Sequence, residues 1–116
     1  MRVLIADDEA PARQKLRRLL AGERDVEIVG EAETGAEAVR AIREQSPDVV
    51  FLDVQMPVLD GFGVVAEVGV DAMPYVVFVT AYDEHALRAF EVRALDYLLK
   101  PVTPDRFRAM LERVRA

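Results

Sequence analysis

Short apolar runs alternate along the chain with segments of helical spacing. The apolar runs, which predict strands, cover residues 3–6, 26–31, 48–52, 75–79 and 96–99. After each run, apolar residues recur three or four positions apart, which is the period of an amphipathic helix. The residues on the predicted inner faces are Ala12, Leu16, Leu19, Leu20, Ala38, Val39, Ile42, Val64, Val65, Val68, Leu87, Phe90, Phe107, Met110, Leu111 and Val114. Such strand–helix repeats with short connections predict an α/β domain, with a parallel sheet covered by helices on both faces.

Turn and cap residues indicate where several of these helices begin and end. Gly22 follows the first helix, and Thr34–Glu37 has the spacing of a capping box that opens the second. Ser46-Pro47 ends that second helix. Thr103-Pro104 supplies an N-cap followed by proline at the first helical position of the last helix. These signals agree with the periodicity of the apolar residues.

Acidic or polar residues stand where four of the predicted strands end. Asp7 and Asp8 follow the first strand, Asp53 the third, Thr80 the fourth and Lys100 the fifth. The carboxyl ends of parallel strands share one edge of a sheet, which is where open α/β folds place their sites. We therefore expect three carboxylates, a hydroxyl and an amine to converge there. This combination predicts a site for a divalent cation and a phosphoryl group.

The acidic residues at this edge point to a metal ion. In a doubly wound sheet of strand order 2-1-3-4-5, the first and third strands are neighbours, which places Asp53 about 4.8 Å from Asp7. Carboxylates this close repel one another unless a cation neutralises them, and Mg²⁺ prefers oxygen ligands. The alternative is that Asp7, Asp8 and Glu9 only cap the first helix. We adopt that alternative for Glu9, and metal binding for Asp7, Asp8 and Asp53.

Thr80 and Lys100 lie at different distances from the first strand, so they can reach different groups. On the same strand spacing, the fourth strand lies about 10 Å from the first and the fifth about 14 Å. The short Thr80 side chain can reach only a group mounted on the neighbouring Asp53. The long Lys100 side chain can cross from the outer strand. A phosphoryl group on Asp53 would then meet both, and its charge would be stabilised by their positions.

Composition narrows the class of protein. With 116 residues, 52% of them hydrophobic and 31% charged, the chain fits one globular domain. The net charge of −6 argues against direct nucleic-acid binding, and no apolar stretch approaches the ~20 residues of a membrane helix. The absence of cysteine excludes disulfides and thiolate metal sites. A cytoplasmic location is the default expectation. The single histidine, His85, is interpreted as an exposed surface residue.

Five segments together resemble the receiver domain of bacterial two-component response regulators. They are Ile5–Glu9, Leu52–Pro57, Asp60-Gly61, Thr80-Ala81 and Asp96–Pro101. The resemblance covers essentially the whole chain, residues 1–116. It implies a flavodoxin-like (βα)5 three-layer sandwich with a five-stranded parallel sheet of order 2-1-3-4-5. Residues 80–90 and 94–97 further resemble receivers attached to DNA-binding domains of the LytTR (LytR/AlgR) type.

The resemblance assigns roles to the residues of the predicted site. It implies that Asp53 is the phosphoacceptor. It also implies that Mg²⁺ is bound by Asp8, Asp53 and the backbone carbonyl of Gln55, with Asp7 acting mostly through water. In this view Thr80 and Lys100 bind phosphoryl oxygens.

Further features follow from the same resemblance. A cis Lys100-Pro101 bond is implied, as is a switch in which Tyr97 turns inward when Thr80 moves toward the phosphoryl group. We predict that Gln55 and Tyr82 set the lifetime of the phosphorylated state, because each lies two residues beyond Asp53 or Thr80. One departure is visible: the stretch from Asp53 to Thr80 is short, which predicts a truncated third helix or a tight loop.

The resemblance also implies partners. Phosphoryl would come from a sensor histidine kinase, and any effector domain, which would control an output such as transcription, would lie outside this chain. The domain would be a phosphoacceptor switch that catalyses only its own phosphorylation and dephosphorylation. We expect weak homodimerisation through the face of the fourth helix, fifth strand and fifth helix. The charged residues of that face are Arg88, Glu91, Arg93, Asp96, Arg106 and Arg113.

Two other functions remain open from the sequence. One is a hydrolase that forms an aspartyl-phosphate, although such enzymes generally have a second acid two residues after the nucleophile, where this chain has Gln55. The other is a receiver-like interaction module that works without phosphorylation. Such modules usually lose one of the acids or the lysine, and this chain keeps them all.

Overall fold

The parallel α/β architecture predicted above is present in the computed structural model, which describes residues 1–83 and 86–116. The strands are β1 (Arg2–Ala6), β2 (Glu27–Ala32), β3 (Val49–Leu52), β4 (Tyr75–Thr80) and β5 (Asp96–Leu99). The helices are α1 (Ala10–Leu20), α2 (Gly35–Gln45), α3 (Gly61–Val68), the 3₁₀ turn η1 (Val70–Ala72), α4 (Ala86–Glu91) and α5 (Pro104–Arg115). The predictions for His85 and for the side chains of Leu87 and Phe90 lie outside what the structure describes.

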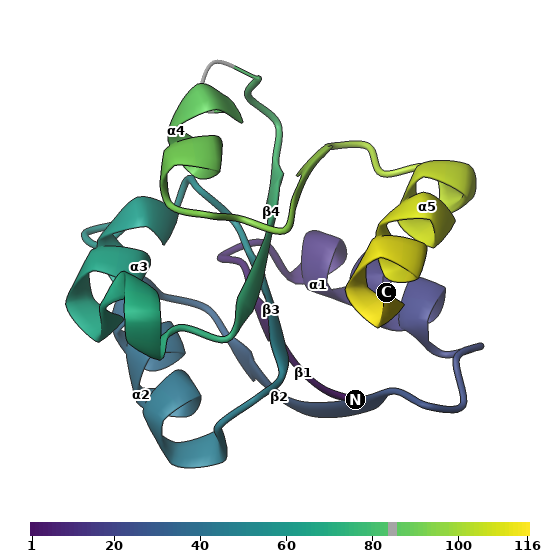
Figure 1. Cartoon of the computed structure of the whole chain (residues 1–116), viewed down its shortest axis with the longest axis horizontal. Helices are drawn as coiled ribbons and strands as arrows, with labels where there is room; N and C mark the ends of the chain where they lie inside the picture. Colours follow the sequence, from purple (N-terminus) through teal and green to yellow (C-terminus); the bar gives the residue numbers. More distant parts are fainter. Residues whose placement is uncertain (84–85) are drawn as a thin grey trace.

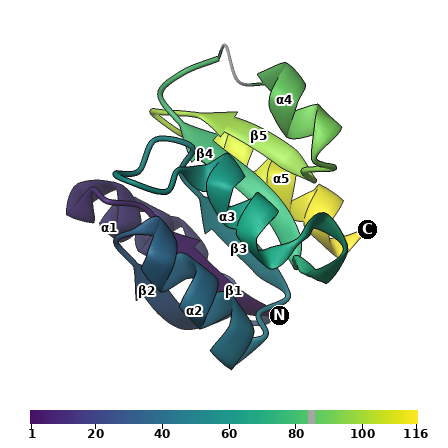
Figure 2. The same ribbon diagram turned by 90° about the vertical axis from the view of Figure 1, so that its left-hand side faces the viewer.

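All five strands are parallel and follow the order β2-β1-β3-β4-β5, as predicted. Helices α1 and α5 cover one face of the sheet, and α2, α3 and α4 cover the other (Figure 1). Figure 2 shows α2 and α3 in front of the sheet and α5 behind it. The molecule is therefore the expected three-layer sandwich. Within the described residues, no helix is both long enough and apolar enough to cross a bilayer.

Two separate hydrophobic cores hold the layers together because successive side chains of a strand point to opposite faces. On β1, Val3 and Ile5 pack with α1 and α5, whereas Leu4 and Ala6 pack with α2 and α3. The continuous apolar strand β3 is buried on both faces in the same way. This double burial explains why the sequence shows unbroken apolar runs rather than alternation.

The predicted caps begin the helices where expected. The Thr34 hydroxyl accepts a hydrogen bond from the Glu37 N–H at 3.1 Å and begins α2. The Thr103 hydroxyl accepts from the Arg106 N–H at 3.2 Å and begins α5. Each of these bonds satisfies a backbone donor that the first helical turn leaves free.

The connection between β3 and β4 contains the short helix expected from the sequence. α3 has only eight residues and ends at Gly69, which has φ 95°. Because this left-handed backbone is unfavourable for other residues, the glycine ends the helix. The turn η1 then leads to β4. This truncation lies at the far end of α3 from the carboxyl ends of the strands.

Candidate functional site

The sheet brings Asp7 and Asp53 side by side at its carboxyl edge. Ala6 pairs with Leu52 in the parallel ladder, so the next residue of each strand reaches the same level. The Asp53 N–H continues the ladder by donating to the Ala6 carbonyl at 2.9 Å. Both carboxylates are almost fully buried, with 1% of Asp7 and 4% of Asp53 exposed. Two buried acids therefore face one another, as the strand pattern predicted.

Four carboxylates gather at this point and fit a divalent cation. One oxygen from each of Asp7, Asp8, Glu9 and Asp53 lies within 4.8 Å of the others. The buried Oδ2 of Asp7 lies 2.8 Å from the Lys100 ammonium. Burial and the charge of Asp7 raise the pKa of Asp53 to about 6, although Lys100 opposes the shift. Hard oxygen ligands whose negative charge exceeds that of the one nearby ammonium are the donor set that Mg²⁺ requires.

Lys100 crosses from the outer strand to these acids, as its length predicted. Its Nζ lies 2.8 Å from Asp7 Oδ2, 3.3 Å from Asp53 Oδ2 and 3.3 Å from Glu9 Oε1. Burial by itself would lower the pKa of Lys100, but the hydrogen bond and charge of Asp7 and of Asp53 raise it above its usual value. The bond from Lys100 to Pro101 is cis, as expected. The ammonium therefore partly neutralises the acids.

The interpretation of Glu9 as a helix cap is confirmed for its position but not for its side-chain contacts. Glu9 occupies the N-cap position of α1, but its side chain accepts no cap hydrogen bond. Its carboxylate instead pairs with Lys100 at 3.3 Å. Lys100 lies 91 residues away in sequence, so nothing local could have revealed this contact.

Thr80 ends β4 at the same edge and is completely buried. Its hydroxyl oxygen accepts a hydrogen bond from the Tyr82 N–H at 3.4 Å. The Thr80 carbonyl accepts from the Lys100 N–H at 2.8 Å. The threonine thus joins the end of β4 both to the loop that follows it and to β5.

The ring of Tyr97 is half-buried on β5 and is tied to the same loop. Its hydroxyl donates to the backbone carbonyl of Tyr82. Its ring contacts Phe78, with centroids 6.3 Å apart. Tyr82, in turn, is 47% exposed. A contact between β5 and the loop after Thr80 is therefore in place, and the role of Tyr97 as a switch stays a prediction.

The loop that follows Asp53 folds back closely over this residue. The Gln55 N–H donates to Asp53 Oδ1 at 3.1 Å, and the Gly61 N–H donates to the Val54 carbonyl at 2.9 Å. A Cβ on Gly61 would lie 2.6 Å from the Asp53 carbonyl oxygen. Glycine is therefore required at the start of α3. The loop thus holds the backbone of Gln55 beside Asp53, and the role of its carbonyl as a metal ligand stays a prediction.

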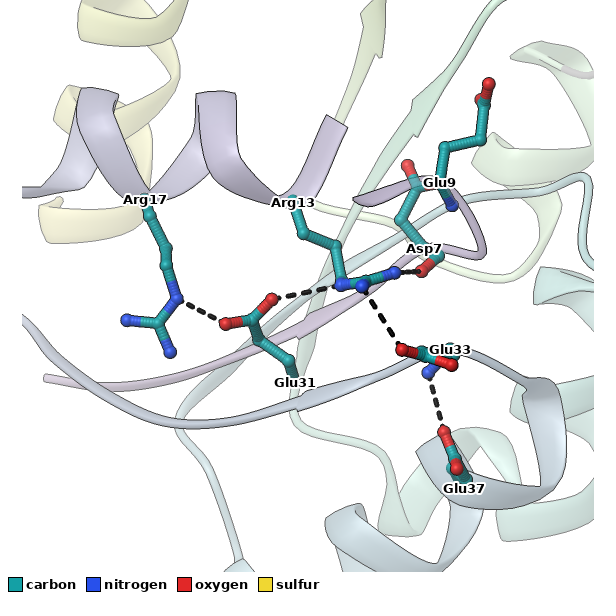
Figure 3. A network of polar contacts seen from close by, with 7 residues as sticks. All are labelled: Asp7, Glu9, Arg13, Arg17, Glu31, Glu33 and Glu37. Carbon is teal, nitrogen blue, oxygen red and sulfur yellow. Dashed lines mark hydrogen bonds and ion pairs between the residues drawn. The ribbon is translucent and has the colours of Figure 1, made fainter. Parts of the chain in front are cut away.

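Sequence reasoning missed Arg13, although it contacts the site. Its side chain is only 11% exposed, and Figure 3 shows it extending from α1 toward Asp7, with Glu31 and Glu33 nearby. Its Nη1 donates to the Asp7 carbonyl at 2.7 Å. The pairing with Glu31 joins α1 to β2 across 18 residues. A contact of this kind leaves no periodic signal in the sequence.

The predicted dimer face also differs from expectation in its pairing. Arg106 binds the buried Asp96 carboxylate through two hydrogen bonds of 3.0 and 2.6 Å, and Arg113 lies 3.5 Å from it. Burial would raise the pKa of Asp96, but hydrogen bonds from Arg106 and the Tyr97 N–H, with the charge of Arg106, hold it below its usual value. Arg93 lies 3.7 Å from Asp71, so at least four of the six charges expected to act between subunits are paired within one chain.

The fold and this acidic edge define the class of the protein. Residues 3–112 match the response regulator receiver domain, and the chain belongs to that family. It is a receiver domain of two-component signal transduction. It is 49% identical over 115 residues to the transcriptional regulatory protein BtsR of Salmonella typhi and 46% identical to BtsR of Escherichia coli K12. Each match covers 99% of this chain and 48% of the relative, so the chain spans about half the length of these curated relatives.

Solved structures show the same architecture. The response regulatory domain of mrkE from Klebsiella pneumoniae matches with a TM-score of 0.90 and 36% identity, over 99% of this chain and 95% of that one. The REC domain of AraT from Geobacillus stearothermophilus matches with a TM-score of 0.88 and 36% identity, over 98% and 92% of the two chains. The flavodoxin-like receiver fold is thereby confirmed.

Proposed function

We propose that Asp53 accepts a phosphoryl group from a phosphohistidine of a sensor kinase. The observation that carries this proposal is the buried Asp53 carboxylate, which lies among Asp7, Asp8 and Glu9 with Lys100 Nζ 3.3 Å away. A buried acid beside a lysine ammonium, with a divalent cation on the neighbouring acids, is suited to accept a group that brings its own negative charge. The hydrolase alternative loses support because Gln55 replaces the second acid.

The transfer needs little covalent chemistry from the protein. One Asp53 oxygen attacks phosphorus, the phosphorus–nitrogen bond of phosphohistidine breaks, and its electron pair stays on the imidazole nitrogen. Asp8, Asp53 and the Gln55 carbonyl would hold Mg²⁺, with Asp7 acting mostly through water. When bound, the ion would neutralise charge on the acids and on the phosphoryl oxygens. Lys100 exchanges its contact with Asp53 for a phosphoryl oxygen.

Thr80 and Tyr97 would respond to the new charge on Asp53 by changing their contacts. The Thr80 hydroxyl can exchange the Tyr82 N–H, at 3.4 Å, for a phosphoryl oxygen on the neighbouring strand. Because Tyr82 also accepts the hydrogen bond of Tyr97, movement of this loop changes the position of Tyr97 on the outer surface. Two discrete arrangements of one loop are a recurring form of switch.

We propose the partners from the site and from the relatives. A small apolar groove of about 220 Å³ borders Lys100, and we propose it as the surface that a sensor histidine kinase contacts. It is lined by Pro11, Ala12, Lys15, Leu16, Val79, Lys100, Pro101 and Val102. An effector domain, expected to be of the LytTR type, would pass the signal to transcription, and we place these components in the cytoplasm. The receiver itself would not bind nucleic acid.

The proposal is tested by incubating the domain with Mg²⁺ and acetyl phosphate and measuring its intact mass. Wild type should gain one phosphoryl group, and Asp53→Asn should gain none. Replacing Gln55 and Tyr82 should change the rate at which the adduct is lost. Wild type without an adduct would contradict the proposal and favour an interaction module that works without phosphorylation.

A further inference from the structure

Arg13 is placed to hold the peptide that carries the metal-binding acids. β1 ends at Ala6, so the Asp7 carbonyl lies beyond the strand, and Arg13 Nη1 donates to it at 2.7 Å. That carbonyl belongs to the peptide bond between Asp7 and Asp8. The Asp7 N–H, on the other side of the residue, donates to the Ala32 carbonyl at 3.0 Å. The backbone of Asp7 is therefore fixed at both of its polar groups.

The guanidinium of Arg13 is itself held by two glutamates. Nε lies 3.0 Å from Glu31 Oε1, and Nη2 lies 3.3 Å from Glu33 Oε1. Arg17, one helical turn later, binds the other oxygen of Glu31 (Figure 3). Burial would raise the pKa of Glu31, but Arg17 and Arg13 hold it below its usual value, so Glu31 remains charged. The network joins α1 and the end of β2 to the Asp7 backbone.

We propose that Arg13 is a positioning residue, which orients the Asp7–Asp8 peptide so that both carboxylates face the metal. This inference rests on the proposed Mg²⁺ site. A planar guanidinium can serve the carbonyl and both glutamates at once because its donors diverge in a fixed plane. Groups that hold metal ligands without touching the metal commonly control affinity about 10- to 100-fold.

Electrostatics and positioning predict opposite results at this residue. Removing the positive charge of Arg13 leaves Glu31 and Glu33 less compensated, and added negative charge near the acids would by itself tighten Mg²⁺ binding. Loss of orientation would weaken it. The sign of the change therefore separates a positioning role from a merely electrostatic one.

Arg17 provides a matched control. It lies on the same helix and binds the same Glu31, but it has no hydrogen bond to Asp7, and 48% of its side chain is exposed. We expect Arg13→Met to weaken Mg²⁺ binding about tenfold. Arg17→Met should stay within about twofold of wild type, because it changes the charge without touching the peptide.

Binding of Mg²⁺ alone is measured by calorimetry and by amide chemical shifts of the Asp7–Asp8 segment, with circular dichroism as the test of folding. If Arg13→Met does not fold, Arg13→Lys replaces it. Lysine keeps the charge but cannot reproduce the fork, and at least threefold weakening is expected. Affinity equal to or tighter than wild type in the folded variant overturns the inference. Wild type that binds no Mg²⁺ would overturn the proposed site as well, which distinguishes the two failures.

Discussion

At the scale of single residues, the largest electrostatic effect on the Asp53 carboxylate is the loss of its hydration on burial. Burial and the Asp7 carboxylate disfavour its charged form and raise its pKa to about 6. Lys100 offsets part of this cost with one ammonium shared among Asp7, Asp53 and Glu9. Because repulsion between the buried carboxylates remains, binding a divalent cation at this site is favourable.

The raised pKa of Asp53 predicts how the metal-free domain responds to pH. Between the ordinary pKa of 3.8 and about 6, the folded protein holds a proton that the unfolded chain has lost, so stability falls as pH rises. Asp53→Asn mimics the neutral acid. At pH 7.5 in a metal chelator, it should raise the free energy of unfolding by roughly 2 kcal/mol, and near pH 4 the difference should vanish. Urea denaturation at both pH values measures this.

The control for this prediction is Asp71→Asn, because the Asp71 side chain is 98% exposed. Its effect should stay within about 0.5 kcal/mol at either pH. An Asp53→Asn domain that is no more stable at pH 7.5, or that keeps the same advantage near pH 4, would show that Asp53 ionisation is not the cause.

At the scale of elements, an ion pair between the partly exposed Arg106 and the buried Asp96 attaches α5 to β5. Asp96, the first residue of β5, has only 4% of its side chain exposed and receives both hydrogen bonds of Arg106. This contact helps orient the surface through which Tyr97 would report the state of the site. Arg113 adds a longer contact of 3.5 Å from the same helix.

Arg106→Met should lower the free energy of unfolding by about 2 kcal/mol, because it leaves the buried Asp96 carboxylate with only the Tyr97 N–H and the more distant Arg113. The pKa of Asp96 is lowered by this pairing, so the loss should be complete above about pH 4 and shrink as pH falls through the lowered pKa. Arg108→Met is the control, since Arg108 forms an exposed pair with Asp105 on the same helix. Equal losses in the two variants, measured in urea, would contradict a special role for Arg106.

At the scale of the whole molecule, the sheet separates two cores and concentrates polar chemistry at one edge. The α4–β5–α5 face lies on the outer side of the sheet, beyond β4 (Figures 1 and 2). It exposes Leu99, with 46% of its surface accessible, together with Arg88 and Glu91. Because Asp96 already pairs with Arg106 and Arg113, an interface between two copies depends on the remaining exposed residues.

Weak dimerisation through this face is expected when the site is loaded. Beryllofluoride with Mg²⁺ mimics the phosphoryl group on Asp53, and sedimentation velocity should show a concentration-dependent increase in mass. Asp53→Asn under the same conditions should remain monomeric, as should wild type with Mg²⁺ alone. If loaded wild type stays monomeric at all concentrations, this face does not dimerise in the isolated domain.

Much of the fold was predictable because burial on both faces leaves a strong pattern. The strands were predicted to within about one residue at each end, as were the truncated α3 and the caps at Thr34 and Thr103. The order of the strands was predicted from the doubly wound fold class, because no local pattern of residues specifies it.

The sequence by itself determined which residues reach the site, since an apolar run that ends in Asp7, Asp53, Thr80 or Lys100 delivers that side chain to the edge of the sheet. Only the tertiary structure decided what those residues contact. Glu9 pairs with Lys100, which is 91 positions away in the sequence. Arg13 donates to the Asp7 carbonyl just beyond the end of β1. Asp96 pairs with Arg106 of the same chain. Periodic burial is a local property that each segment records. Pairing between charged side chains depends on distances that exist only after the layers have packed.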